Sequence, residues 1–315
     1  MPLDPQARAL LGQLAEGPPV HTLTAEQARH ASKLRRSKAA TSEPRTVASV
    51  TDELIPGPAG PLPVRIYRPD EARDRPVLLF FHGGGWVTCD LDSHDGYCRD
   101  LTMGARCVVV AVDYRLAPEH PYPAAVEDAY AALRWVASHG RTHGWDERKV
   151  GVAGDSAGGN LAAVLTLLAR DRGGPCIAVQ VLLYPVTDHA ESDSYKRHGN
   201  GDFVTADAMR WYWKHYLGEA DGSDPYASPL RVISMRCLPP ALVVVAEFDP
   251  LHDEGVAYAR RLRAEGVETT LLDVGGMFHG FATLGSTLDK ARHVLGLVGC
   301  TLSDAFSRPP GTGVG

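Results

Sequence analysis

The sequence lacks the features that mark membrane, nucleic-acid-binding and secreted proteins. Its formal net charge is −6, so it has no basic excess of the kind that binds nucleic acid. The first residues contain no basic segment followed by an apolar one, and no secretory signal is visible. The longest apolar runs are far shorter than the roughly 20 residues of a membrane helix: they are Val77–Phe81, Cys107–Val112 and Ala241–Ala246. We therefore expect a cytoplasmic protein with no membrane span and no nucleic-acid partner.

The cysteines also form no pattern that would indicate a metal site or a disulfide framework. The chain has 6 cysteines, none in a C-x-x-C pair and none at ligand spacing with a histidine. In a chain without a secretory signal, we expect these cysteines to be reduced and mostly packed in the fold. The sequence therefore predicts no metal site and no structural disulfide.

Short β-rich runs follow one another from about residue 46, and several are apolar throughout rather than alternating. Continuous apolar runs are typical of strands buried on both faces of a parallel sheet. The eight predicted strands are Val47–Leu54, Val64–Tyr67, Val77–Phe81, Cys107–Val112, Val150–Ala153, Ile177–Leu183, Leu242–Ala246 and Thr269–Val274. The predicted helices between and after them are Pro123–Ser138, Ala157–Arg172, Pro250–Ala264 and Leu288–Phe306. This alternation predicts an α/β fold with a mostly parallel sheet covered by helices on both faces.

Two parts of the chain lie outside this alternation. Residues 1–45 are helical and polar; Thr24–Gln27 has the spacing of a capping box, Ala28, Ala31 and Leu34 follow on one face, and the basic stretch Lys33–Lys38 reads as the solvated side. Residues 187–236 form an insertion, a long connection rich in aromatics, and connections that long are usually functional. Residues 307–315 are rich in proline and glycine, and we expect a flexible tail there.

Gly154-Asp155-Ser156-Ala157-Gly158 is a G-x-S-x-G motif between a predicted strand and a predicted helix. A serine on this sharp turn projects its oxygen above the sheet, and glycines are needed where side chains would clash. An ordinary strand-to-helix turn with a serine N-cap is the simpler alternative. The placement between strand and helix favours a nucleophilic serine.

A second glycine cluster, His82-Gly83-Gly84-Gly85-Trp86, comes directly after the strand Val77–Phe81. Glycines at this position let backbone N–H groups approach a substrate oxyanion. A phosphate-binding loop is the alternative, but neither glycine-rich nucleotide motif is present. His82 precedes the serine, which is the wrong chain order for a base, so we interpret it as an anchor of the loop.

The remaining partners are expected in the order acid and then histidine after the serine. His279 lies among glycines just after the last predicted strand, whereas the other later histidines lie in helices or in the insertion. Asp249 ends the preceding strand, where its alternative role is N-cap of the helix that Pro250 begins. Asp253 would sit further along that helix and brace the loop. We therefore predict Ser156, Asp249 and His279 as the catalytic residues.

Together with Asp113–Ala125, Asp224–Leu230 and Phe278–Phe281, the two glycine motifs resemble the hormone-sensitive lipase family, also called bacterial family IV esterases. The resemblance covers about residues 45–300. It implies an α/β-hydrolase fold with a core of residues 46–186 and 237–306, and a helical cap of residues 1–45 and 187–236. It implies an oxyanion hole at the N–H groups of Gly83, Gly84 and Ala157. The tail is residues 307–315.

The implied activity is hydrolysis of a small-molecule ester through an acyl-enzyme, without metal or cofactor. We expect short- to medium-chain acyl groups, with Trp86, Trp211 and Phe281 in the substrate pocket and Tyr212, Trp213 and Tyr216 in its roof or packed beneath it. An amidase or peptidase on the same triad and a non-catalytic ligand-binding protein are the alternatives. We also consider a homodimer through the last edge strand.

Overall fold

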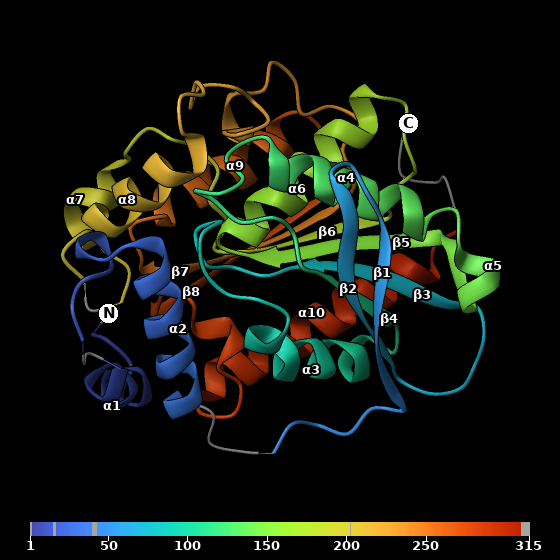
Figure 1. Cartoon of the computed structure of the whole chain (residues 1–315), viewed down its shortest axis with the longest axis horizontal. Coiled ribbons are helices and arrows are strands. Elements are labelled where there is room, and N and C mark those ends of the chain that lie inside the picture. Colours follow the sequence, from blue (N-terminus) through green and yellow to red (C-terminus); the bar gives the residue numbers. More distant parts are fainter. Residues whose placement is uncertain (1, 15–16, 40–42, 202, 310–315) are drawn as a thin grey trace.

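A twisted sheet of eight strands runs through the middle of the computed structural model, which describes residues 2–14, 17–39, 43–201 and 203–309 (Figure 1). The strands are β1 (Ser49–Gly57), β2 (Gly60–Arg68), β3 (Arg75–Phe81), β4 (Val108–Val112), β5 (Trp145–Asp155), β6 (Val179–Leu183), β7 (Ala241–Phe248) and β8 (Thr269–Phe278). Their order is β1-β2-β4-β3-β5-β6-β7-β8. All pairs from β4 to β8 are parallel, and only β1 and β2 run antiparallel to their neighbours. The predicted α/β architecture is confirmed.

Helices cover both faces of the sheet. The α-helices are α1 (Pro5–Leu14), α2 (Ala25–Ala39), α3 (Asp95–Ala105), α4 (Ala124–Val136), α5 (Gly140–His143), α6 (Ala157–Asp171), α7 (Asp193–His198), α8 (Ala206–Leu217), α9 (His252–Ala264) and α10 (Asp289–Ser307). The short 3-10 turns are η1 (Val20–Thr22), η2 (Asp92–His94), η3 (Pro229–Arg231) and η4 (Phe281–Thr283). Helices α4, α6 and α9 pack on one face and α3 and α10 on the other, which gives a three-layer core.

The strand sequences account for this layering. Every residue of β4 and β6 is buried, as is the segment Val77–Phe81 of β3, because both faces are covered by helices. The first strand, β1, is mostly exposed at the edge of the sheet. Helix α3 was not predicted, because Gly96 and Gly104 are poor helix formers, although its buried residues Tyr97 and Leu101 lie at helical spacing.

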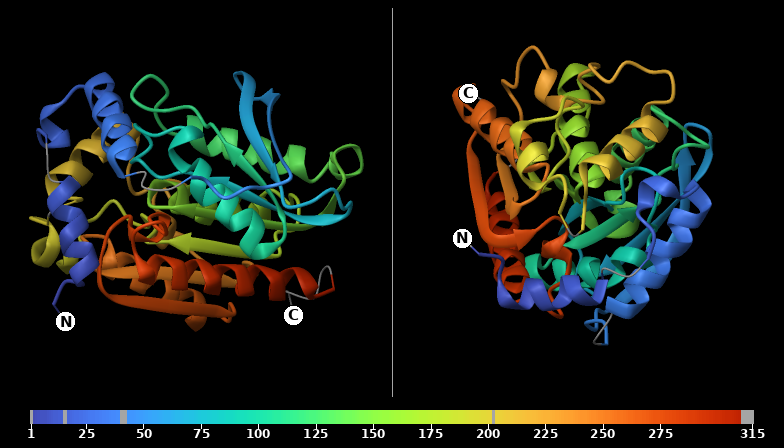
Figure 2. Two further views of the ribbon diagram at one scale, coloured as in Figure 1. Left: turned by 90° about the horizontal axis from the view of Figure 1, so that it is seen from below. Right: turned by 90° about the vertical axis from the view of Figure 1, so that its left-hand side faces the viewer.

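The segments outside the core gather at one end of the sheet. Helices α1 and α2 lie beside α7 and α8 at the end where the parallel strands terminate (Figures 1 and 2). The predicted capping box is present, because Thr24 Oγ1 accepts from the Gln27 amide at 3.2 Å and Gln27 Oε1 accepts from the Thr24 amide at 3.0 Å. These helices therefore stand over the edge where ligands bind in α/β proteins.

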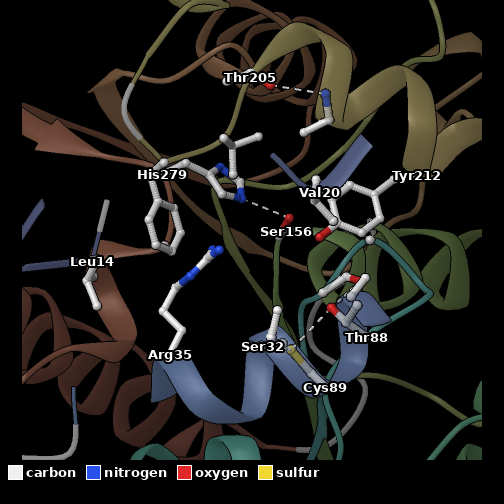
Figure 3. A pocket seen from close by; sticks show the side chains of 18 of the residues that line it. Leu14, Val20, Ser32, Arg35, Thr88, Cys89, Ser156, Thr205, Tyr212 and His279 are labelled. Atoms are coloured by element: carbon white, nitrogen blue, oxygen red, sulfur yellow. Dashed lines mark hydrogen bonds between the residues drawn. The ribbon is translucent and has the colours of Figure 1, made fainter. Parts of the chain in front are cut away.

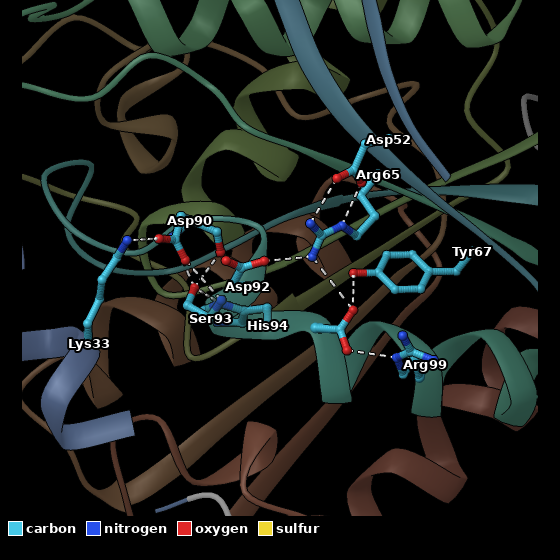
Figure 4. Close-up of polar contacts among 10 residues, drawn as sticks. Lys33, Asp52, Arg65, Tyr67, Asp90, Asp92, Ser93, His94 and Arg99 are labelled. Carbon is cyan, nitrogen blue, oxygen red and sulfur yellow. Dashed lines mark hydrogen bonds and ion pairs between the residues drawn. The ribbon is translucent and has the colours of Figure 1, made fainter. Parts of the chain in front are cut away.

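Polar contacts hold α2 against the core. The Arg29 guanidinium donates to the carbonyls of Val87 and Ala117 and pairs with Glu119. Lys33 pairs with Asp90 at 3.0 Å, on the loop that follows β3 (Figure 4). The position of α2 over the sheet is thus fixed by charges on two separate core loops.

The same loop region is tied to the β1–β2 hairpin by a second set of ion pairs. The Arg65 guanidinium binds Asp52 of β1 and Asp92 of η2 at 2.7 and 2.8 Å, and the Tyr67 hydroxyl donates to Asp95 at 3.1 Å (Figure 4). Bidentate arginine contacts of this kind fix geometry better than single lysine contacts. These contacts therefore fix the position of the loop after β3, which leads into the site.

Three sequence expectations need correction. Three of the cysteines are exposed, namely Cys176, Cys237 and Cys300, so the cysteines are not mostly packed, although none is disulfide-bonded. Leu34 is 53% exposed, so the packed face of α2 does not continue through it. Helix α9 begins at His252 rather than at Pro250.

The end of the predicted tail, residues 310–315, lies outside the described residues. In the part of the chain that the structure describes, no helix is both long and apolar enough to span a membrane.

Candidate active site

Ser156 stands on the sharp turn between β5 and α6. Its backbone has φ +55° and ψ −118°, a conformation that side-chain-bearing residues rarely adopt, and the residue is 8% exposed. The Ser156 amide donates to the Leu183 carbonyl at 2.9 Å, which fixes the turn against β6. A side chain at Gly154 or Gly158 would collide with backbone, because Gly158 lies against the Phe81 carbonyl. The glycines of the motif are therefore required by close packing, as the sequence predicted.

His279 and Asp249 complete a buried chain of hydrogen bonds with this serine. The Ser156 hydroxyl donates to His279 Nε2 at 2.9 Å, and His279 Nδ1–H donates to Asp249 Oδ2 at 2.7 Å. His279 is 5% exposed and Asp249 is fully buried. A carboxylate only accepts, so Asp249 holds the proton of the imidazole on Nδ1 and leaves Nε2 as the acceptor. The structure brings together the three residues predicted as catalytic.

Two further contacts involve Asp249 and His279. Asp249 Oδ1 accepts from the Leu251 amide at 2.8 Å, which orients its carboxylate without capping a helix. The Tyr184 ring lies against the imidazole of His279, with centroids 4.8 Å apart, and burial raises the pKa of its phenol. Asp253 turns away to Arg197 of α7 at 2.7 Å, so it braces the insertion. Tyr184 carries no motif signal and was missed from the sequence.

The glycine loop after β3 corrects one predicted residue. The Gly83 amide donates to Asp155 Oδ1 at 2.8 Å, so this N–H already has a partner and is not available to a substrate oxyanion. Gly84 and Gly85 line the cavity in front of Ser156, with φ of +112° and +60° that suit glycine. A run of identical glycines does not reveal which of its amides faces the cavity, so the sequence could not show that the Gly83 amide is engaged by Asp155.

His82 anchors this loop, as predicted. Its Nδ1 lies 2.7 Å from the Gly83 carbonyl oxygen, and its ring stacks on Tyr114, with centroids 4.4 Å apart. The Tyr114 hydroxyl donates to the His82 carbonyl at 2.7 Å. Asp155 also contacts His94 Nε2 at 3.0 Å. The loop is therefore held by buried polar groups on three separate segments.

A cavity of about 320 Å³ opens above Ser156 (Figure 3). Its floor consists of Gly84, Gly85, Ser156 and His279, and its walls come from α1, η1 and α2 on one side and from the start of α8 on the other. The wall residues include Leu14, Val20, Leu23, Ala28, Ala31, Ser32, Arg35, Val204, Met209 and Tyr212. Both segments outside the core therefore enclose the serine.

The three residues predicted for the pocket do not belong to the described residues that line this cavity. Trp86 is fully buried and stacks on Tyr216, with centroids 3.9 Å apart, so it packs the base of α8. Trp211 packs against Ala25, Val87 and Ala117. Phe281 is buried beneath the site among residues of the α10 side. Of the aromatic residues predicted for the roof, Tyr212 lines the cavity, while Trp213 and Tyr216 pack beneath it.

Arg35 is a cavity residue that the sequence analysis missed. The stretch Lys33–Lys38 was interpreted as a solvated face, yet Arg35 reaches into the cavity (Figure 3). A signal was present, since Ala28, Ala31, Ser32 and Arg35 share one helical face at spacings of three and four residues. Across the described ranges, no group of three His, Cys, Asp or Glu residues gathers as metal ligands would.

Known proteins share the fold of this chain and much of its sequence. The profile of the alpha/beta hydrolase fold family matches residues 78–283. Carboxylic ester hydrolase LipN of Mycobacterium tuberculosis is 49% identical over 249 residues, which make up 76% of this chain and 66% of LipN. The ethyl acetate hydrolase of Pseudomonas putida is 40% identical over 290 residues, or 89% of this chain and 90% of that protein.

A solved structure agrees over nearly the whole chain. The hyperthermophilic esterase of Pyrobaculum calidifontis superimposes with a TM-score of 0.91 at 39% identity, covering 96% of this chain and 99% of that one. The chain therefore belongs to the α/β-hydrolase superfamily. Within that superfamily it is a member of the hormone-sensitive lipase-like family of carboxylic ester hydrolases.

Proposed function

We propose that the protein is a serine carboxylesterase that hydrolyses short- to medium-chain acyl esters through an acyl-enzyme. The observation that carries this proposal is the hydrogen-bonded chain from Ser156 through His279 to Asp249 on the floor of a closed-in cavity. Nucleophile, base and orienting acid in this geometry perform acyl transfer in many unrelated proteins.

The reaction proceeds in two steps. His279 Nε2 takes the Ser156 proton as the serine oxygen attacks the ester carbonyl, and the resulting imidazolium gives that proton to the departing alcohol. Water then attacks the acyl-enzyme with His279 again as base, which releases the acid and restores the serine. Asp249 holds the tautomer and stabilises the imidazolium in both steps.

The oxyanion of each tetrahedral intermediate needs backbone donors. We assign this role to the N–H groups of Gly84, Gly85 and Ala157. Gly84 and Gly85 line the cavity, and Ala157 is the first residue of α6, where the helix directs its positive end toward the serine. No acceptor for these three N–H groups occurs among the residues described.

The size of the cavity limits the length of the acyl chain that the substrate can carry. A methylene group gains about 0.8 kcal/mol only while it stays buried. An enclosed volume of about 320 Å³ therefore favours esters whose acyl chain ends within it. We propose that residues 1–45 and 187–236 act as the cap that sets this limit.

The direct test compares the wild-type chain with Ser156→Ala on p-nitrophenyl esters of increasing acyl length. We expect kcat/KM to rise, peak and fall with chain length, and the variant to retain at most the residual catalysis of about 10³–10⁴-fold over water that triad deletions leave. Near-normal turnover by the folded variant would contradict the proposal. Anilides of the same acids test the amidase alternative, and a ligand-binding protein would hydrolyse neither series.

We also propose that two copies pair through β8. This strand ends the sheet and has β7 as its neighbour within the chain, so its outer edge can extend the ladder. Sedimentation velocity tests the pairing, and a single species of 33.9 kDa at micromolar concentration would contradict it.

A further inference from the structure

The Arg35 side chain crosses the cavity wall and directs its guanidinium toward Ser156 and His279 (Figure 3). Its Nε is buried and has no hydrogen-bond partner. Arg35 is the only lysine or arginine among the described residues that line this cavity. A guanidinium whose Nε has no hydrogen-bond partner therefore faces the reacting atoms from the cavity wall.

The other cations of helix α2 behave differently. Arg29 is bound by Glu119 and by two backbone carbonyls, and Lys33 is bound by Asp90. Both of them attach the helix to the core. Arg35 has no such ion pair within the described residues, so its charge does not serve to dock the helix.

The acid that lines the same cavity is already engaged. Asp155 accepts from the Gly83 amide at 2.8 Å and lies 3.0 Å from His94 Nε2, so its carboxylate faces the glycine loop. The remaining walls near Arg35 are apolar or weakly polar, including Leu14, Leu284 and Ser32. A ligand that brings its own negative charge would complete the hydrogen bonds of Arg35, whereas a purely apolar ester would leave them unmade.

We propose that Arg35 binds a carboxylate carried by the substrate, so that the preferred esters bear a free carboxylate on either the acyl or the alcohol part. This inference rests on the proposed esterase function and adds the substrate class. The planar guanidinium matches a carboxylate through two parallel N–H···O bonds. Because the cavity is partly closed to water, this ion pair is stronger there than on the surface.

Matched pairs of esters test the proposal with the full chain. Monoethyl glutarate against the ethyl ester of glutaric monoamide places the charge on the acyl side. For the alcohol side, 3-acetoxybenzoate is compared with 3-acetoxybenzamide. Each pair differs by one carboxylate in place of a neutral amide of similar shape. The measured quantity is the ratio of kcat/KM for the charged ester to kcat/KM for its neutral partner, so effects common to both esters cancel.

In the wild-type chain we expect at least one pair to favour the charged ester. Arg35→Gln should lower that ratio at least about tenfold, since a charge-assisted bidentate contact is lost. Arg35→Lys, which keeps the charge and loses the fork, should fall between them. Lys214→Gln removes an exposed charge from α8 outside the cavity and should leave the ratio unchanged.

An equal ratio in wild type, Arg35→Gln and Arg35→Lys for both pairs would overturn the proposal. Equal reductions in Arg35→Gln and Lys214→Gln would also overturn it, because a general field effect would then suffice. If Arg35→Gln does not fold, as judged by thermal unfolding, Arg35→Lys decides alone. Ser156→Ala, assayed on the same four esters, separates the two hypotheses, because hydrolysis that survives in this variant contradicts the esterase function itself.

Discussion

The carboxylate of Asp155 accepts a hydrogen bond of 2.8 Å from the amide of Gly83, a residue that lies on a different strand end. Asp155 immediately precedes Ser156, and Gly83 immediately precedes the glycines that line the cavity. One buried carboxylate therefore joins the turn that carries the serine to the loop proposed to hold the oxyanion donors. We therefore expect the distance between Ser156 and the proposed donors to depend on this bond.

Asp155→Ala should lower kcat about 10²–10³-fold, the range found when oxyanion stabilisation is lost, because the glycine loop would no longer be fixed to the serine turn. Asp155→Asn keeps an acceptor and should lose less. Steady-state kinetics on a short-chain p-nitrophenyl ester provide the measurement. Asp207→Asn, an exposed acid paired with Arg210, is the matched control. An unchanged kcat in a folded Asp155→Ala chain would contradict the positioning role.

Asp249→Asn should lower kcat by up to about 10⁴-fold, because an amide can donate to Nδ1 and impose the wrong tautomer on His279. Asp253→Asn removes an ion pair with Arg197 and should act on stability more than on turnover. Comparing kcat with the thermal midpoint for both variants separates these effects. The opposite order of severity would mean that the acid has been assigned to the wrong residue.

Much of this site could be predicted because short stretches of sequence carry its signals. Ser156 lies in a recognisable strand–turn–helix motif, and His279 follows the last strand as chain order requires, although the backbone that Gly158 packs against belongs to the distant residue Phe81. The bond between Gly83 and Asp155 joins residues far apart in sequence, so no local pattern reveals it. Arg35 was interpreted as solvent-exposed for a related reason. Helical spacing shows on which face of α2 its side chain lies, but it does not show that a cavity lies opposite that face.

In the fold too, features with a local sequence pattern were predicted and features that depend on distant residues were not. Continuous apolar strands such as β4 and β6 were found because burial on both faces leaves a strong mark. The orientation of Trp86 was not, since an indole beside the glycine loop could face the cavity or the core. The stacking partner Tyr216 lies on α8, in the long insertion, and its position depends on tertiary packing alone.

The Arg29–Glu119 contact should make cap docking sensitive to acid. The hydrogen bond from Arg29 lowers the pKa of Glu119 to about 2 from its ordinary value of 4.5. Its contribution to stability is complete above pH 4.5 and is lost as pH falls through this interval. Because Glu119 is more than half exposed, we expect at most about 1 kcal/mol. The difference in unfolding free energy between wild type and Glu119→Gln should therefore shrink below pH 4.5, and a constant difference would contradict this account.

Asp113 should act in the opposite direction. Burial, followed by the charges of Asp90 and Asp92, raises its pKa to about 6 from 3.8. The folded state therefore binds the proton more tightly than the unfolded state, and stability is lost as pH rises between these values. Asp113→Asn should stabilise the protein by about 1 kcal/mol at pH 7, allowing for partial exposure. Urea unfolding at pH 7 and near pH 4 checks this, and a gain of equal size at both values would contradict it.

Leu14, at the end of α1, stands apart from Ser156 across the cavity (Figure 3). Leu14→Trp should fill that region, so kcat/KM should fall for longer acyl chains and change little for acetate. A loss of about 0.8 kcal/mol for each excluded methylene gives roughly fourfold per added carbon. A chain-length series of p-nitrophenyl esters measures it. A uniform loss across the series would show that Leu14 supports the cap without meeting the substrate.

The walls of the cavity and its floor come from parts of the chain with different tolerance to change. The serine turn is packed so tightly that even a methyl group at Gly158 would strike backbone, whereas α2 is attached mainly through the side chains of Arg29 and Lys33. Substrate preference can therefore diverge in evolution while the reacting groups stay fixed. The same separation makes the first forty-odd residues a unit for exchange between relatives, and chimaeras that keep the Glu119 and Asp90 contacts should inherit selectivity from one parent and chemistry from the other.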